Sequence, residues 1–392
     1  MAPLAKDEGS VMKNTMEESI VSKSLVFLGT RSKDEGAGIF SCFFDPKSGA
    51  CTQPSLATKM TLPTAFALGR EGTYLYSTSE TGNDGTCDAN LFAYRIDKQT
   101  GRLELLNHIS SNGGGATHLA LDATGNTLVV ATFGAGRTNA FRILSDGRLG
   151  ELTACMQHEG TGPHRRQKSP HAHGVAFSPD NRFVLSADMG ADRVFIFRFD
   201  ECSGVLKPNS PPFFDVPAGW GPRQLVFHPS GKYVYLMNEL SAMITVLAWS
   251  MKEGVLTQIQ TVAAMSPDAE GEPSGGAIAM DPQGRYFYTS TRNDNCIEMF
   301  AINPQDGTLS LAQRTKSTGI LPWGCALDST GEYLFISNKD SNSTAIYRVD
   351  AAKGCLFLIN PGIVSPQPVT GIVLRRELVQ RRVAVVGGQR VC

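Results

Sequence analysis

A short phrase recurs six times along the chain, and this internal repeat constrains the fold more than any other feature. Each copy is a turn followed by a β-rich run: REGTYLYSTSE (70–80), ATGNTLVVATF (123–133), PDNRFVLSADM (179–189), PSGKYVYLMNE (229–239), PQGRYFYTSTR (282–292) and STGEYLFISNK (329–339). The turn residues are Gly72, Gly125, Asn181, Gly231, Gly284 and Gly331. Glycine, or asparagine in its place, suits a hairpin turn that needs a positive φ. The spacing indicates structural units of roughly 50 residues.

A second phrase marks another hairpin in each unit and occurs once more often than the first. Its copies are DPKSGAC (45–51), DKQTGRL (97–103), SDGRL (145–149), DECSGVL (200–206), MKEGVL (251–256), PQDGTL (304–309) and DAAKGCL (350–356). Seven copies against six are explained if one unit is shared between the two ends of the chain. We therefore expect SLVFLGT (24–30) to pair with PVTGIVL (368–374).

Units of this length with four short strands each are typical of a β-propeller, in which radial repetition leaves only short, protected edges. The sequence predicts an all-β fold, a seven-bladed β-propeller with four antiparallel strands per blade, closed into a ring by strands from both termini. An open solenoid is disfavoured, because the terminal segments complete one unit instead of forming polar caps. The propeller is expected over residues 24–374, between a polar tail (1–23) and an Arg-rich tail (375–392).

Aligning the copies reveals two positions whose chemistry varies from unit to unit. Eight residues before the turn lie Thr64, Thr117, His173, Arg223, Gly276 and Trp323, and eight residues after it lie Glu80, Phe133, Met189, Glu239, Arg292 and Lys339. The two strands are antiparallel, so the start of one and the end of the other meet at the same end of a blade. Both sets should therefore face one end of the central channel. We predict a catalytic set of His173, Arg223 and Glu239, with substrate binding by His171, Arg292, Glu80, Lys339 and Trp323.

The overall charge of the chain limits the classes of molecule that it can bind. Lys and Arg number 36 against 37 Asp and Glu, which gives a net charge of −1 and no global attraction for nucleic acid. A few local arginines still suffice for a small anion. The loop GTGPHRRQKSPH (160–171) is basic and could overhang the channel to attract a phosphate or carboxylate, or be an ordinary solvated loop.

Cysteine usage and the N-terminal segment bear on location. Nine cysteines without a C-x-x-C pair indicate free thiols in a reducing compartment. Residues 1–23 contain no apolar run of the kind found in a signal peptide, and no later stretch is long enough to span a membrane. The sequence predicts a cytoplasmic protein without a membrane partner, as a monomer or weak oligomer.

His171 and His173 lie two residues apart in SPHAHGVAF, which would place both on the same side of a strand. Such a pair could ligate a metal, act in acid–base chemistry or line the channel as a structural element. No acidic or cysteine partner is fixed nearby in sequence, so we predict no metal site.

Three segments resemble the lactonase-type seven-bladed propeller family, which includes propeller-type 6-phosphogluconolactonases and 3-carboxy-cis,cis-muconate cyclases. They are SPHAHGVAFSPDNRFVLSADMGADRVFIFRFD (169–200), GPRQLVFHPSGKYVYLMNEL (221–240) and PQGRYFYTSTRNDN (282–295). The resemblance implies an enzyme of small lactones whose site contains a histidine, two arginines and a glutamate. Those residues correspond to His171 or His173, Arg223, Arg292 and Glu239.

The expected reaction is hydrolysis of an anionic sugar lactone, with no cofactor. Glu239 would act as base and His173 as proton donor, while Arg223 and Arg292 would clamp the substrate and stabilise the oxyanion. Two alternatives stay open. The same residues could close 3-carboxy-cis,cis-muconate or a related carboxylated substrate to a lactone, or the propeller could be a non-catalytic scaffold or ligand-binding protein.

Overall fold

The tight turns predicted from the repeat join the two innermost strands in six of the seven blades. All six turn residues have positive φ, from 58° at Asn181 to 77° at Gly331. In the fifth blade, for example, the turn at Gly231 joins β16 (Pro222–Phe227) to β17 (Tyr233–Asn238), and the two strands pair in antiparallel fashion. The computed structural model describes residues 23–32, 34 and 36–375. The predicted tails, 1–23 and 375–392, lie outside this part except for Lys23 and Arg375 at their inner ends.

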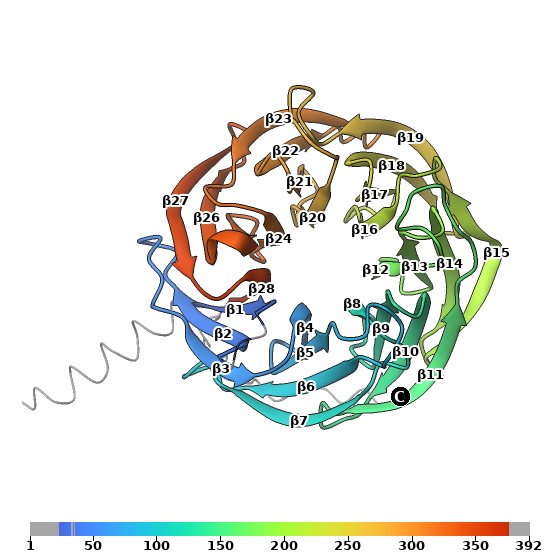
Figure 1. Cartoon of the computed structure of the whole chain (residues 1–392), viewed down its shortest axis with the longest axis horizontal. Helices are drawn as coiled ribbons and strands as arrows, with labels where there is room; N and C mark the ends of the chain where they lie inside the picture. The colour runs from blue at the N-terminus through green and yellow to red at the C-terminus, as the bar shows by residue number, and fades with distance from the viewer. Residues whose placement is uncertain (1–22, 33, 35, 376–392) are drawn as a thin grey trace, which may run out of the picture.

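Seven four-stranded antiparallel sheets follow one another around a central axis (Figure 1). The first combines β28 (Pro368–Leu374) with β1 (Ser24–Thr30), β2 (Gly38–Phe44) and β3 (Ser55–Lys59). The second contains β4 (Pro63–Gly69), β5 (Tyr74–Ser79), β6 (Asn90–Ile96) and β7 (Leu103–Ser110); the third β8 (Ala116–Leu121), β9 (Thr127–Thr132), β10 (Arg137–Ile143) and β11 (Leu149–Gln157). The fourth contains β12 (Ala172–Phe177), β13 (Phe183–Asp188), β14 (Arg193–Asp200) and β15 (Val205–Asp215).

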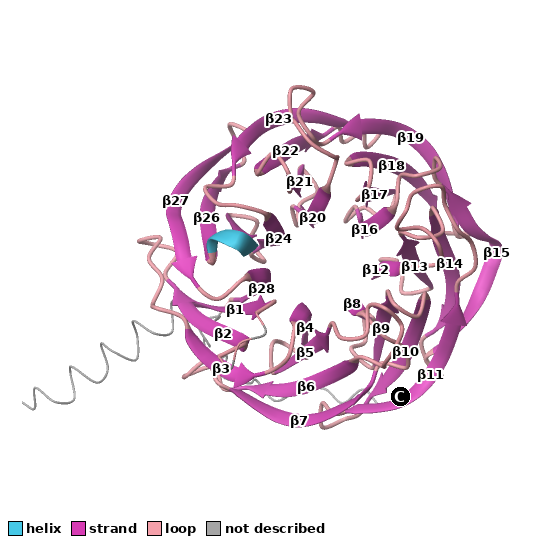
Figure 2. Cartoon of the chain, in the orientation of Figure 1, coloured by secondary structure: helices cyan, strands magenta, loops and turns pink. Residues whose placement is uncertain are grey.

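The remaining three blades repeat this order. The fifth contains β16, β17, β18 (Met243–Ser250) and β19 (Val255–Ala263); the sixth β20 (Gly275–Met280), β21 (Tyr286–Thr291), β22 (Cys296–Ile302) and β23 (Leu309–Lys316); the seventh β24 (Pro322–Leu327), β25 (Tyr333–Asn338), β26 (Ser343–Asp350) and β27 (Cys355–Val364). Within the described residues the only helix is one 3₁₀ turn, η1 (Lys339–Ser341), as Figure 2 shows. None of these residues forms a helix with the length and apolarity needed to cross a bilayer.

The predicted ring closure is confirmed. β28 pairs with β1 along six residue pairs, from Leu25 opposite Leu374 to Thr30 opposite Pro368. The hydrophobic core consists of seven clusters, and each is formed by two neighbouring blades. One such cluster joins Leu185 of β13 to Leu236 of β17, both fully buried. Because every blade buries both of its faces against neighbours, the ring is a rigid frame for the side chains around its axis.

Candidate functional site

The innermost strand of each blade has an irregular start. Register shifts lie between Pro63 and Phe66, Ala116 and His118, Ala172 and Gly174, Pro222 and Gln224, Gly275 and Ile278, and Pro322 and Gly324. Each shift encloses one of the six variable positions that the sequence placed before the turn. A β-bulge of this kind re-aims a side chain away from the regular pleat. The scaffold therefore presents residues such as His173 and Arg223 in the same way in successive blades.

The second variable position is held by one hydrogen bond that recurs around the whole ring. The backbone N–H of that residue donates to the carbonyl two residues before the bulged position, in the pairs Glu80–Leu62, Phe133–Gly115, Met189–His171, Glu239–Gly221, Arg292–Ser274, Lys339–Leu321 and Arg31–Gln367, at 2.7–3.0 Å. The last pair belongs to the blade that is shared between the termini. Arg31 is therefore the seventh member of the set.

A cavity of about 190 Å³ lies on the axis. Its lining includes residues from all seven innermost strands, β4, β8, β12, β16, β20, β24 and β28, which identifies it as part of the central channel. Among the predicted site residues, His173, Arg223, Trp323 and Glu80 line it directly. The prediction that they face one channel is thus consistent with the geometry.

Glu239 is the centre of a group of charges that we call the mouth cluster: Arg166, His173, Arg223, Glu239 and Arg292. Its Oε2 accepts a hydrogen bond from Arg223 Nε at 2.9 Å and lies 3.6 Å from His173 Nε2. Its Oε1 is 2.8 Å from Arg166 Nη1 and 3.4 Å from Arg292 Nη1. The side chains of Glu239, Arg223 and Arg292 are at most 7% exposed, whereas that of Arg166 is 43% exposed. Three arginines thus converge on one carboxylate.

Arg223 is fixed from a second side by a glycine. Its Nη1 donates to the carbonyl oxygen of Gly276 at 3.0 Å. A Cβ at position 276 would come within 2.2 Å of Ser290 Oγ, so no side chain fits there without displacing its neighbours. The glycine at this variable position therefore contributes its backbone to the site.

Trp323 supports the other buried arginine. The guanidinium of Arg292 lies 4.1 Å from the centre of the indole ring, within the range of a cation–π interaction. Arg31 and Lys339 approach the same ring at 5.2 and 5.8 Å. The indole thus contacts three cationic side chains at one edge of the channel.

The charges of the mouth cluster set the protonation states. Burial alone would raise the pKa of Glu239, but the nearby charges of Arg292 and Arg223 outweigh it and hold that pKa well below its ordinary value. Burial, assisted by Arg223, holds the pKa of His173 well below 6.5. Burial and Arg292 lower the pKa of Arg223 to about 10, which leaves it charged at neutral pH. The cluster therefore combines three cations, one carboxylate and a neutral imidazole.

Three predicted residues lie at the edge of this cluster. Glu80 forms a two-bonded ion pair with Arg31, both at 3.0 Å. Lys339 pairs with its neighbour Asp340 at 2.9 Å. His171 precedes β12, so the expectation that it shares a strand with His173 is wrong; its ring stacks on Phe133 and its backbone N–H donates to Asp188. The charges of Glu80 and Lys339 are balanced by neighbouring residues, so these two side chains shape the rim more than they attract an anion.

A larger hollow of about 920 Å³ adjoins the rim and shares Glu80 with the axial cavity. Arg31 and Lys59 line it together with the acidic residues Asp34 and Asp84. Its mixed charges give it no clear preference for an anion.

Two site residues were not identified individually from the sequence. Arg31 was not identified because its blade is split between the termini. An alignment that joined the N-terminal strand to the C-terminal strand would have identified it. Arg166 belongs to the basic loop 160–171, which was only a candidate overhang. The neighbouring Gln167 is fully buried, and its amide donates to Met189 O and Asp192 Oδ1 at 2.8 and 2.7 Å. This anchor holds the loop over the channel.

Comparison with known proteins finds a matching family profile and relatives along most of the chain. A family profile described as "Lactonase, 7-bladed beta-propeller" matches residues 25–374. A 6-phosphogluconolactonase of Bacillus subtilis is 31% identical over 349 residues, which cover 89% of this chain and 98% of the relative. One from Formosa agariphila is 28% identical, covering 84% and 94%. The solved structure of a periplasmic gluconolactonase from Pseudomonas aeruginosa superimposes with a TM-score of 0.84 at 25% identity, covering 90% and 99%.

Proposed function

Since the chain belongs to the lactonase family of seven-bladed β-propellers, we propose that it hydrolyses a phosphorylated sugar lactone of the 6-phosphogluconolactone type. The observation that carries the proposal is the charge of the mouth cluster. Arg166, Arg223 and Arg292 face a single carboxylate, Glu239, beside a neutral His173. This leaves a surplus of two positive charges. A phosphate monoester, whose second pKa is about 6, carries nearly two negative charges at neutral pH and matches that surplus.

The arginines divide the work between binding and catalysis. Arginine binds phosphate through a planar fork of N–H donors, and the exposed Arg166 is free to move from Glu239 to an incoming anion. Arg223 and Arg292 are buried and held by Gly276 and Trp323. Preorganised cations in such positions stabilise the oxyanion that forms when water attacks the lactone carbonyl.

The contacts of Glu239 favour a different base from the one expected from the sequence. Arg166, Arg223 and Arg292 engage both of its carboxylate oxygens, so we assign Glu239 a positioning role in place of the base. Its Oε2 lies 3.6 Å from His173 Nε2, where its charge stabilises an imidazolium. The neutral imidazole of His173 then takes the proton from the attacking water. The imidazolium returns it to the ring oxygen as the C–O bond breaks, which gives the open hydroxy acid.

The test is turnover by the purified protein, followed as acid release in a pH-stat. We expect hydrolysis of 6-phosphogluconolactone at least about tenfold more efficient than that of the unphosphorylated lactone, which corresponds to about 1.4 kcal/mol. His173→Ala should lose most of this activity and keep its fold. Equal rates for both lactones would contradict the proposal that the arginines recognise the phosphate. Closure of 3-carboxy-cis,cis-muconate in the absence of lactone hydrolysis would replace the proposal with the cyclase reaction.

A further inference from the structure

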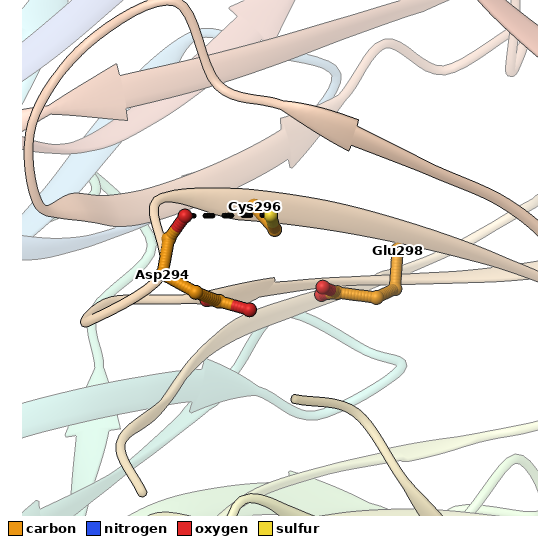
Figure 3. A group of neighbouring side chains, drawn as sticks. All are labelled: Asp294, Cys296 and Glu298. Carbon is orange, nitrogen blue, oxygen red and sulfur yellow. Dashed lines mark hydrogen bonds between the residues drawn. The ribbon is translucent and has the colours of Figure 1, made fainter. Parts of the chain in front are cut away.

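A second group of reactive side chains lies in the sixth blade, away from the mouth cluster. Asp294 is in the turn before β22, and Cys296 and Glu298 follow on that strand at alternate positions, so they share a face. Their ligand atoms all lie within 4.8 Å of one another. Figure 3 shows the carboxylates of Asp294 and Glu298 pointing toward each other, with the thiol of Cys296 beside them.

Each carboxylate in this group has one oxygen held and one oxygen free. Oε1 of Glu298 accepts from Thr291 Oγ1 at 3.0 Å and from Arg314 Nε at 3.3 Å, while its buried Oε2 has no partner. One Asp294 oxygen, Oδ2, lies 3.5 Å from the backbone nitrogen of Ser266, and Oδ1 is also buried without a partner. Glu298 is fully buried. Unpartnered buried carboxylate oxygens are costly and call for a cation or a proton.

The surroundings resemble the outer shell of a metal site. In such sites the carboxylate ligands are themselves hydrogen-bonded, which fixes the direction of the free oxygen. Thr291 and Arg314 do this for Glu298, and Arg314 is anchored in turn by a 2.6 Å bond from Nη2 to Ala264 O. A cavity of about 360 Å³, lined by Asp294, Cys296 and Arg314, borders the group and gives an ion and water a way in.

We propose that Asp294, Cys296 and Glu298 bind a divalent transition-metal ion of the Zn²⁺ type. Thiolate, with two carboxylates, favours such an ion over Mg²⁺ or Ca²⁺, which prefer oxygen ligands alone. Three protein ligands leave the fourth tetrahedral position for water from the cavity. This geometry requires ligand atoms about 3.5 Å apart, so a bound ion would draw Asp294 and Cys296 toward the fixed Glu298 from their present separations of up to 4.8 Å. Asp294 lies two residues after Arg292, so the ion would stabilise the turn that follows this arginine.

The experiment uses the full-length protein, stripped of metal by a chelator and titrated with Co²⁺, whose bond to a thiolate gives a charge-transfer absorption. We expect one Co²⁺ per chain with this absorption, displaced by Zn²⁺. Cys296→Ser should abolish the absorption, and Glu298→Gln should weaken Co²⁺ binding at least about tenfold. Cys202→Ser is the matched control, because Cys202 is an exposed thiol in another blade, and it should change neither readout.

Two results would contradict the proposed metal site. The absorption could persist in Cys296→Ser, which would place the ion at another thiol. Alternatively, the stripped wild-type protein could bind no Co²⁺ and unfold at the same temperature with and without Zn²⁺, which would indicate that Asp294 and Glu298 share a proton. The second measurement uses the unmodified protein, so it decides the question even where a variant fails to fold. Neither result bears on the lactonase proposal, which rests on other residues.

Discussion

Arg166 offers the sharpest test of how the mouth cluster binds its substrate, because it combines an exposed side chain with a 2.8 Å contact to a buried carboxylate. Replacing it with alanine leaves Glu239 paired with Arg223 and Arg292. The side chain is 43% exposed, so the loss in stability should stay below about 1 kcal/mol. In contrast, a hydrogen bond to a charged group contributes about 1.5–3 kcal/mol, which corresponds to a loss of about 10- to 150-fold in kcat/KM.

The assay compares kcat/KM of Arg166→Ala for 6-phosphogluconolactone and for the unphosphorylated lactone. We expect the loss to appear mainly in KM and only with the phosphorylated substrate. Arg165→Ala is the matched control: this neighbour is 73% exposed and pairs with Glu272 at 3.3 Å instead of Glu239. The reasoning is refuted if Arg166→Ala leaves the phosphorylated substrate unaffected, or if it slows both lactones equally.

Three further predictions follow from the mouth cluster. Glu239→Gln leaves the buried Arg223 and Arg292 without their counter-charge and should lower the free energy of unfolding by about 3 kcal/mol. Urea denaturation measures this loss, and an unchanged midpoint would show that the ion pairs do not stabilise the fold. Because the pKa of His173 lies well below 6.5, the imidazole stays neutral as the pH falls from 7 to 6. With the unphosphorylated lactone, which has no group that titrates in this range, kcat/KM should therefore stay constant, whereas a decline centred on 6.5 would indicate an ordinary histidine. Gly276→Ala should cost about 1–3 kcal/mol by overpacking against Ser290 and lower activity through Arg223; a fully active, equally stable variant would contradict this.

The fold was predictable because its determinants are local. Turn residues such as Asn181 and Gly231 adopt the positive φ that their sequence positions indicated, and the alternating strands followed from them. Even the closing pair, Ser24–Thr30 with Pro368–Leu374, could be predicted, because counting two repeated phrases exposed the incomplete unit. The structure does not test the expectations of a cytoplasmic location and of a monomer or weak oligomer, and both stay predictions.

The site was only partly predictable, because repeat alignment gives positions around the ring but not contacts across it. It indicated His173, Arg223, Glu239 and Arg292, which the structure brings into one cluster. It could not show that Arg166 reaches Glu239, since that contact depends on how a loop crosses the channel. The same limit explains why Glu239 was expected to be the base. Burial and three arginines set the pKa of its carboxyl group, and none of these arginines adjoins it in sequence.

The Asp294, Cys296 and Glu298 group was missed for a different reason. Their alternation was visible in the segment NDNCIEMF, but a buried glutamate on a strand looks from sequence like a solvated one. Only the packing shows that Glu298 is fully buried with a free oxygen. The prediction of no metal site rested on the two histidines near the channel and on the absence of a C-x-x-C pair, and neither feature involves Asp294 or Glu298.

We propose that the mouth cluster binds a phosphorylated sugar acid or lactone. A crystal structure of the protein with 6-phosphogluconate, the product of the proposed reaction, tests this claim most directly. We expect the product on the channel axis, with its phosphate within hydrogen-bonding distance of Arg166 and its carboxylate near Arg223 and His173. Binding in the hollow beside Arg31 and Asp34, with the contact between Arg166 and Glu239 intact, would contradict it.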